Sequence, residues 1–408
     1  MSDLRAPWWK LLLAALVLVV VALLAAPILT IGAANRALGA DRPDQAAQLR
    51  PNAAALARLG AAAQRAGRPQ DAARLAQEAL AASPINVVAI RTLGQARAKL
   101  NAPTAGDELL LLASKWGWRD RPTQFWALEK ALRAGQGDVV LQRGEAMIRL
   151  NSNRQGALLA FRLLANDPAT RALLVQRLAL RPDWRPFFFE PELPIGANQL
   201  DAMNAVLLDL ARMGATPSRG EAAATFRAML DGNKGITAFG TYRRLFARGG
   251  KSLLPGGDFS PASVGAGQTP TPFDWNLRQE GAAGAELARA PDGAESLFAS
   301  ASGSADAMLA GRTLLLPPGS YVLTGRMLAQ SATAGDLLLW TMTCRGGRPV
   351  LSPGRPVRAQ GETWTKFAVP FTVPVGCPIQ QLELIARGGD DTQAPPEAFF
   401  DDLGIARG

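Results

Sequence analysis

Histidine is absent from this chain of 408 residues, and only two cysteines occur, Cys344 and Cys377. The missing imidazole excludes a Ser–His–Asp relay, a Cys–His pair and any histidine-ligated zinc or iron site. Two thiols are too few for a thiolate metal cage. Hydrophobic residues make up 48% of the chain, so disorder is not expected to dominate.

Without histidine, paired carboxylates are the remaining candidates for hydrolytic catalysis. The visible pairs are Asp390-Asp391 and Asp401-Asp402. Adjacent residues of a strand point to opposite faces of a sheet, so neither pair need converge on one bond. The sequence also carries no nucleophile elbow and no glycine-rich phosphate loop. We therefore expect a protein that is not an enzyme.

Positive charge is concentrated in the first part of the chain. Residues 256–408 hold 11 Lys/Arg and 15 Asp/Glu, so of the 44 and 34 in the whole chain the first 255 residues hold 33 and 19, a balance of +14. This excess predicts contact with lipid headgroups, an anionic polymer or an acidic protein face. The alternative is that arginine-rich helices simply have solvated basic faces.

A long apolar run near the N-terminus predicts a membrane segment. Trp8–Ile31 contains one charge, Lys10, and the following 21 residues match the ~20 needed to cross ~30 Å of hydrocarbon. Trp8 and Trp9 stand where an interfacial aromatic belt would lie. We predict a single-pass anchor over residues 1–40, with a short cytoplasmic N-terminus, in a bacterial inner membrane.

Two features of this segment leave alternatives open. Gly32-Ala33-Ala34 could serve as a cleavage site, which would make the run a removed signal peptide. Basic residues occur on both sides of the run, so the positive-inside rule does not fix the orientation. The cysteine pair and the C-terminal fold favour export, so we expect the bulk of the chain in the periplasm. Nucleic acid is therefore not an expected partner.

Residues 41–250 have the rhythm of helical hairpins. Leu56, Leu59 and Gly60 open a helix–turn–helix pattern, and the same pattern returns 34 residues later as Ile90, Leu93 and Gly94. This spacing resembles the tetratricopeptide repeat, with alanines replacing the usual larger aromatics. The resemblance implies an α-solenoid with a groove for other envelope proteins. Beyond Lys99 only the architecture continues, with an extended stretch expected over Arg185–Pro194.

Two aromatic groups stand out in the helical region: Trp116-Gly117-Trp118 and Phe187-Phe188-Phe189. Aromatics at helix ends and in a proline-bounded linker usually pack between repeats, and this is the prediction for both. The alternative for both is a recognition surface.

Residues 251–408 change to short apolar runs separated by Gly, Pro, Ser and Thr, as in an antiparallel β-sandwich. The expected strands are Thr313–Leu316, Ser320–Ala329, Leu337–Cys344, Thr363–Thr372, Gln380–Ala386 and Ala398–Ile405. Four motifs resemble the jelly rolls of bacterial carbohydrate-binding modules: Leu254–Phe259, Gly319-Ser320-Tyr321, Thr363–Phe367 and Phe399–Leu403.

This second resemblance implies several site residues. A structural calcium would fall on Asp258 and Asp402, although Ser260 replaces the usual glutamate. Trp275 and Trp340 are the candidates for stacking on a glycan, with core packing as the alternative for Trp340. Trp364 is expected to fill the space between the sheets. Beyond this calcium, no cofactor is expected.

Cys344 and Cys377 are predicted to form a disulfide. Both lie at the ends of expected strands of one domain, and the proposed compartment is oxidising. The alternative is two separate buried thiols.

Together these features predict a multidomain α and β protein: a transmembrane helix, an α-solenoid and a β-sandwich. The expected function is that of a non-catalytic, single-pass accessory protein in the assembly or export of a cell-surface polysaccharide (an exopolysaccharide). The alternative is a periplasmic scaffold subunit of another membrane complex, without sugar binding.

Overall fold

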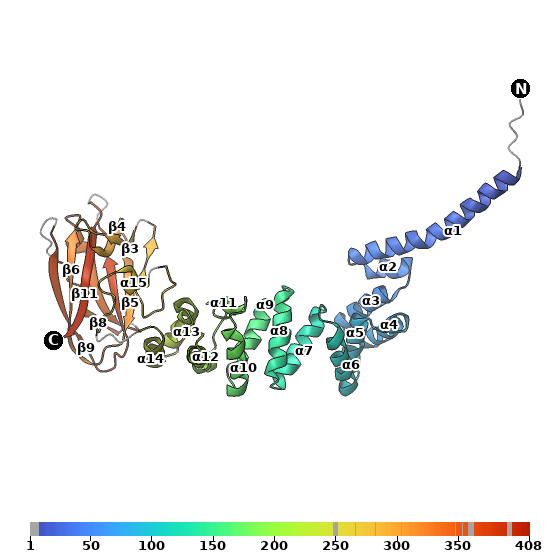
Figure 1. Ribbon diagram of the computed structural model, residues 1–408, viewed down its shortest axis with the longest axis horizontal. Coiled ribbons are helices and arrows are strands. Elements are labelled where there is room, and N and C mark those ends of the chain that lie inside the picture. The colour runs from blue at the N-terminus through green and yellow to red at the C-terminus, as the bar shows by residue number, and fades with distance from the viewer. Residues whose placement is uncertain are drawn as a thin grey trace, which may run out of the picture. The chain divides into compact units, whose positions relative to one another are not determined.

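The computed structural model describes residues 8–247, 252–265, 267–281, 283–302, 304–346, 348–352, 354–357, 363–389 and 394–408. The chain divides into two compact units, Met1–Ala160 and Phe161–Gly408. Helices form the first unit and open the second, and two antiparallel sheets complete the second (Figure 1). The predicted order of an apolar N-terminal helix, helical hairpins and a β-sandwich is confirmed.

The N-terminal helix α1 spans Trp8–Gly39 and continues through Pro27. Its stretch Leu12–Gly39 is long and apolar enough to cross a membrane. Large apolar side chains are exposed from Leu12 to Ile31, whereas Ala34 and Leu38 are buried against Ala46 of the next helix. Only the C-terminal end of α1 therefore belongs to the packed part of the first unit.

Helical hairpins follow α1 in the first unit. Their helices are α2 (Pro43–Leu49), α3 (Ala53–Arg65), α4 (Pro69–Ala82), α5 (Val87–Lys99), α6 (Pro103–Trp116), α7 (Arg121–Arg133) and α8 (Gly137–Arg149), with α9 (Arg154–Leu164) next in the chain. A Cβ on Gly60 would lie 3.3 Å from the Ala72 oxygen, and one on Gly94 would lie 2.9 Å from the Gly106 oxygen. The repeated glycine thus marks the closest approach of two helices in each hairpin.

Local sequence fixes where these helices begin. Asn52, Asn86 and Asp120 cap α3, α5 and α7, each accepting a hydrogen bond from the backbone N–H three residues on. The helices α4 and α6 begin instead with a proline, Pro69 and Pro103, at the first turn, where no N–H partner is needed.

The second unit opens with α10 (Pro168–Ala179), α11 (Arg185–Phe188), η1 (Ala197–Gln199), α12 (Leu200–Arg212), α13 (Arg219–Asp231) and α14 (Gly235–Leu245). The stretch expected to be extended is instead a short helix followed by turns. Buried Arg162 explains this, because its guanidinium donates to the carbonyls of Phe188 (2.7 Å) and Pro194 (3.0 Å). Burial lowers the pKa of Arg162 to about 10. The predicted packing of Phe188 and Phe189 is confirmed, since both are buried.

The sandwich follows the short helix α15 (Pro261–Val264) and contains α16 (Ala334–Leu337). Sheet A has the order β1 (Asn276–Leu277), β5 (Ala307–Leu314), β10 (Gln380–Ala386), β7 (Leu338–Cys344), β8 (Arg348–Ser352). Sheet B has the order β2 (Gln279–Glu280), β3 (Ala283–Arg289), β4 (Glu295–Ala301), β11 (Glu397–Arg407), β6 (Gly319–Ala329), β9 (Thr365–Val373). Every pairing described is antiparallel.

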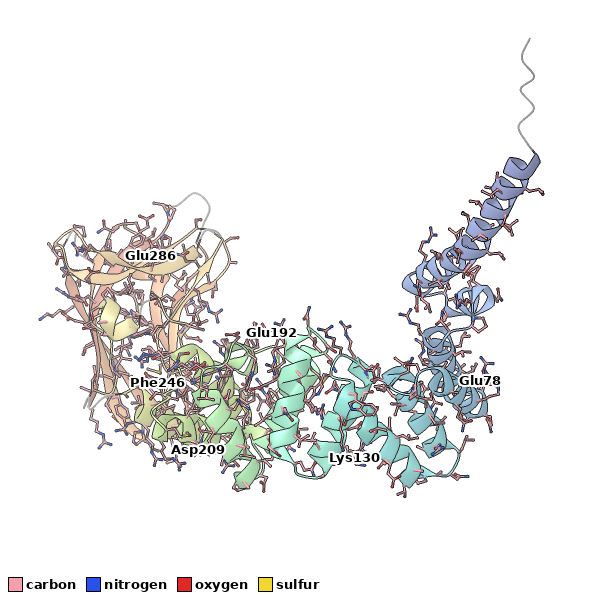
Figure 2. All side chains as sticks on the ribbon, turned by 45° about the vertical axis from the view of Figure 1, so that its right-hand side comes forward. Glu78, Lys130, Glu192, Asp209, Phe246 and Glu286 are labelled. Atoms are coloured by element: carbon pink, nitrogen blue, oxygen red, sulfur yellow. A yellow bond between two sulfur atoms is a disulfide. The ribbon has the colours of Figure 1, made fainter. Side chains whose placement is uncertain are left out.

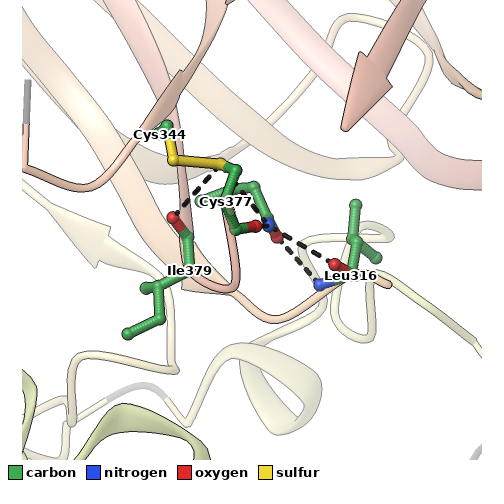
Figure 3. The surroundings of a disulfide bond; sticks show 5 residues. Leu316, Cys344, Cys377 and Ile379 are labelled. Atoms are coloured by element: carbon green, nitrogen blue, oxygen red, sulfur yellow. Dashed lines mark hydrogen bonds between the residues drawn. A yellow bond between two sulfur atoms is a disulfide. The ribbon is translucent and has the colours of Figure 1, made fainter. Parts of the chain in front are cut away.

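The predicted disulfide between Cys344 and Cys377 is confirmed, with 5.7 Å between the Cα atoms (Figure 3). Buried Gln380, at the start of β10, accepts a hydrogen bond from the Leu316 N–H at 2.8 Å. The bridge ties the turn before β10 to the end of β7, and Gln380 ties the start of β10 to the segment after β5.

The strand prediction was incomplete. Strands β3 and β4 were missed because alanine, glycine and serine make up much of their sequences and neither strand contains a β-branched residue. Strand β5 begins six residues before the predicted Thr313 because its glycine and alanine pair with β10 at the centre of sheet A.

Candidate functional site

The two tryptophans predicted to stack on glycans lie in the core of the sandwich. Trp275 and Trp340 are each 3% exposed, and their ring centroids are 5.7 Å apart. The Trp275 indole donates to the Gly256 carbonyl at 2.9 Å. A ring enclosed between two sheets offers no face to a sugar, so neither residue stacks on a glycan, and the core packing given as the alternative for Trp340 is confirmed.

The prediction for Trp364 fails in the opposite sense, since its side chain is partly exposed. The Arg326 guanidinium lies over the ring at 4.4 Å, and the indole N–H donates to Asp292 at 2.7 Å. Hydrogen bonds from the Ala294 N–H and from Trp364 lower the pKa of Asp292. Trp364 therefore packs outside the core, with one face covered by a cation.

The acidic residues of the implied calcium site are engaged with protein groups. Asp402 binds the Arg326 Nε at 3.0 Å, and Asp258 accepts a hydrogen bond from the Ser263 hydroxyl at 2.5 Å. The Leu403 N–H donates to the Gly257 carbonyl at 2.8 Å, which joins the two neighbouring segments. Among the described residues no group of three or more His, Cys, Asp or Glu gathers to hold a metal. Calcium binding stays a prediction, and the cation placed against Asp402 is a guanidinium.

The carboxylates of the doublet Asp401-Asp402 both lie against the Arg326 guanidinium. Asp401 is buried and paired with Arg326, whereas Asp402 is mainly exposed at a positive φ of 53°. Asp390-Asp391 lies outside the described residues.

A buried carboxylate joins the last helices to the sandwich within the second unit. One oxygen of Asp274 accepts hydrogen bonds from the Tyr242 hydroxyl at 2.8 Å and the Arg219 Nε at 3.2 Å. Its other oxygen accepts from the Thr271 N–H at 3.0 Å and hydroxyl at 2.7 Å. Burial, and then the charge of Asp274, raise the pKa of Tyr242 to about 12.

Aromatic rings surround this polar contact. Phe273, in the segment before β1, lies 5.6 Å from Phe226 of α13 and 5.3 Å from both Phe239 and Tyr242 of α14, centroid to centroid. Phe246 follows α14 at the same junction (Figure 2), 5.8 Å from Tyr242. The helices α13 and α14 are thus packed directly on the sandwich. The space between α13 and the sandwich therefore has walls that are fixed relative to each other.

That space opens on the outer face of sheet A. Alternation in β10 points Leu382 and Leu384 into the core and leaves Gln381, Glu383 and Ile385 on the other face. Glu383 pairs across the strands with Gly311 on one side and Thr341 on the other. Gly311 has no side chain, and a Cβ there would lie 3.4 Å from the Glu383 Cγ, so the glycine lets Glu383 pack against β5.

A polar cavity of about 350 Å³ lies between this face and α13. Its charged lining residues are Arg227, Asp231, Arg278, Arg312, Arg345 and Glu383. Arg345 and Asp231 form an ion pair across it at 2.6 Å. Burial raises the pKa of Glu383, and the nearby charge of Arg278 opposes this shift.

This arrangement suits a polar ligand held by hydrogen bonds. Guanidinium groups present donors in a fixed plane, although Arg312 already donates to the carbonyls of Pro255 and Phe273 and Arg345 pairs with Asp231. Glu383, Gln381 and Asn276 add acceptors. A second cavity of about 350 Å³ lies on the same face, and both are lined by Met308. The cavity contains none of the site residues predicted from the sequence. The alternation of Gln381 and Glu383 with Leu382 and Leu384 was the sequence signal that could have indicated a polar outer face on this strand.

No protein-family model matches the chain, and no curated protein matches it. Solved structures are similar to its two kinds of domain. TmCBM61, in complex with β-1,4-galactotriose, is 14% identical, with 39% of this chain and 100% of that chain covered and a TM-score of 0.26. A carbohydrate-binding module of Cellvibrio mixtus lichenase 5A, in complex with cellotriose, is 18% identical, with 32% and 92% covered and a TM-score of 0.21.

The helical region has its own similar structures. A tetratricopeptide repeat protein from Parabacteroides merdae is 12% identical, with 56% of this chain and 94% of that chain covered and a TM-score of 0.28. The PilF protein of Pseudomonas aeruginosa is 15% identical, with 55% and 94% covered and a TM-score of 0.23.

Proposed function

We propose that this protein is a non-catalytic, membrane-anchored accessory protein of cell-surface polysaccharide assembly or export. In this role α1 spans the inner membrane, the solenoid binds other envelope proteins in the periplasm, and the sandwich binds a glycan. The observation that carries the proposal is the polar cavity between α13 and sheet A. Its arginine-rich lining favours a glycan that bears carboxylates, such as a polyuronate.

The burial of Ala34 supports an anchor that stays in the mature protein. The alternative cleavage site, Gly32-Ala33-Ala34, lies within α1, and Ala34 is 1% exposed against α2 and α3. Cleavage after Ala34 would remove this buried side chain from the packed end of the first unit.

Affinity electrophoresis of the full-length protein through gels containing alginate, a polyuronate, tests glycan binding. Arg227→Gln and Arg278→Gln should each reduce the retardation at least about tenfold, since each removes a charge-assisted contact. Arg289→Gln is the matched control, because Arg289 lies on β3 of the other sheet and is largely exposed. Equal retardation of all three variants would remove the cavity from the proposal.

The second candidate function is a scaffold subunit without sugar binding. The alanine-lined hairpins of α3–α6 favour it, because such repeats build protein-binding surfaces. A co-purified membrane complex, together with no retention by any glycan, would select this function. Turnover of the same polysaccharides by purified protein would contradict the non-catalytic role.

A further inference from the structure

Every second connection between the helices of the first unit lies on the same edge of that unit. The Asn86 side chain, at the start of α5, donates to the Ala53 carbonyl at the start of α3, at 3.5 Å. The Arg91 Nε of α5 binds the Asp120 carboxylate at the start of α7, at 2.8 Å. Connections α2–α3, α4–α5 and α6–α7 are therefore neighbours, and the antiparallel α7–α8 hairpin returns the end of α8 to the same side. We call residues 49–52, 83–86, 116–122 and 149–153 the α3-start edge.

This edge is basic and apolar. Its exposed large apolar side chains are Leu49, Ile85, Trp116, Trp118 and Leu150. It carries four basic residues, Arg50, Arg119, Arg121 and Arg149, and one acidic residue, Asp120, which is paired with Arg91. On the opposite edge, connections 40–42, 66–68, 100–102 and 134–136 expose one large apolar side chain, Leu100. Trp116 is half-exposed, and Trp118 packs one face against Arg143 of α8 in the next hairpin while 38% of it stays exposed.

The apolar part of α1 projects from the packed helices of the first unit at this same edge. The buried Ala34 and Leu38 contact α2 and α3, and Arg58 of α3 donates to the Leu38 carbonyl. The connections from α1 to α2 and from α2 to α3 are short, and the helices they join are in contact, so we infer that successive helices alternate in direction and that α1 runs parallel to α3. The N-terminal part of α1 projects away from the packed helices (Figure 1). The exposed apolar run of α1 ends at Ile31, three residues or about 4.5 Å of helix before Ala34. A bilayer that takes up this run would meet the edge at headgroup level.

The exposed Trp118 is held in place before any contact. The Arg143 guanidinium lies over the Trp118 ring at 3.9 Å and donates to the Ser114 carbonyl at 3.0 Å. Gly117 allows a close approach, since a Cβ there would lie 2.5 Å from Val87. A fixed ring loses little conformational freedom on binding.

We propose that the α3-start edge is a second membrane contact, which lies on the anionic headgroup layer of the bilayer that α1 enters. Ile85, Trp116 and Trp118 enter the interface, where amphipathic rings are favoured. Arg50, Arg119 and Arg121 bind lipid phosphates. The inference rests on the membrane anchor of the proposed function, and it sets the solenoid close to the membrane surface.

Hydrogen exchange of the full-length protein in nanodiscs tests this contact. Peptides covering residues 83–86 and 116–122 should exchange more slowly in discs of phosphatidylcholine with 30% phosphatidylglycerol than in pure phosphatidylcholine discs. Peptides covering 66–68 and 100–102 should not change. The double variant Arg119→Gln/Arg121→Gln should reduce the lipid-dependent protection by about fivefold per charge.

Matched controls lie on the opposite edge. Arg42→Gln/Arg68→Gln removes two exposed arginines, and Leu100→Ser matches Trp118→Ser, because each parent side chain is 38% exposed. Equal exchange with and without the anionic lipid, or equal effects of the two arginine pairs, would overturn the proposal. Extraction by alkaline carbonate distinguishes failure of the membrane anchor from failure of the edge contact. If carbonate removes the protein from membranes, α1 is not an anchor. If the protein resists carbonate but its α3-start edge shows no lipid-dependent protection, only the edge contact is refuted.

Discussion

The junction between α14 and the sandwich should depend on the carboxylate of Asp274. This side chain is 6% exposed and accepts four hydrogen bonds, from Tyr242, Arg219 and twice from Thr271. Asp274→Ala leaves these donors without their acceptor in a buried site. Breaking such a buried charged contact costs about 3–5 kcal/mol. The junction should therefore open at least about 100-fold more often than in the parent protein.

Hydrogen exchange of the full-length protein measures this opening locally, which avoids the assumption that a chain of several domains unfolds in two states. Peptides covering 238–246 and 271–276 should lose protection, whereas peptides of α3 and α4 should not change. Asp306→Ala is the control, because Asp306 is half-exposed and holds only Arg387 and the Gly388 N–H. Its loss should cost less than about 1 kcal/mol. If both variants exchange alike, Asp274 does not hold the junction.

Three further predictions follow from single residues. Thiol counting on denatured, unreduced protein should find no free thiol, and two reactive thiols would contradict the bridge. The double variant Cys344→Ser/Cys377→Ser should destabilise the sandwich by roughly 3–4 kcal/mol, as expected for a loop of 33 residues. N-terminal sequencing of the mature protein should not begin at Asn35 or Arg36, where cleavage after Gly32-Ala33-Ala34 would leave the new end. The pKa of Glu383 is raised by burial, so the folded state loses stability as pH rises from the unfolded to the folded pKa. Glu383→Gln should therefore be relatively more stable than the parent at neutral pH and equal to it below about pH 4, and a stability difference that does not vary with pH would refute this account.

The sequence anticipated the elements whose signals are local. The start of α13 follows from Ser218 and Glu221, which form a capping box with reciprocal hydrogen bonds. The central part of β10 follows from Gln381–Leu384, where polar and apolar residues alternate. The recurrence of Leu93 and Gly94 34 residues after Leu59 and Gly60 predicted the hairpins, because both glycines fit the same close helix contact.

The roles of the tryptophans were not decided by local sequence. Trp275 and Trp340 were candidates for a surface and lie in the core, whereas Trp364 was expected in the core and lies outside it. An aromatic residue in a strand can face either side, and the choice depends on which face the partner sheet covers. That pairing brings together strands far apart in the chain, as where β10 pairs with β5 and β7.

The cavity and the α3-start edge also required the tertiary structure. The cavity joins Arg227 of α13 with Arg278 beside β1 and Glu383 of β10, which no local pattern relates. The edge gathers Arg50, Ile85 and Trp118 from three connections, spaced about one repeat apart. By itself the sequence determined the helical period, the apolar N-terminal run and the two cysteines, because each depends on neighbouring residues or composition. The tertiary structure decided which side chains meet, because burial and charge pairing depend on distances between segments that only folding brings together.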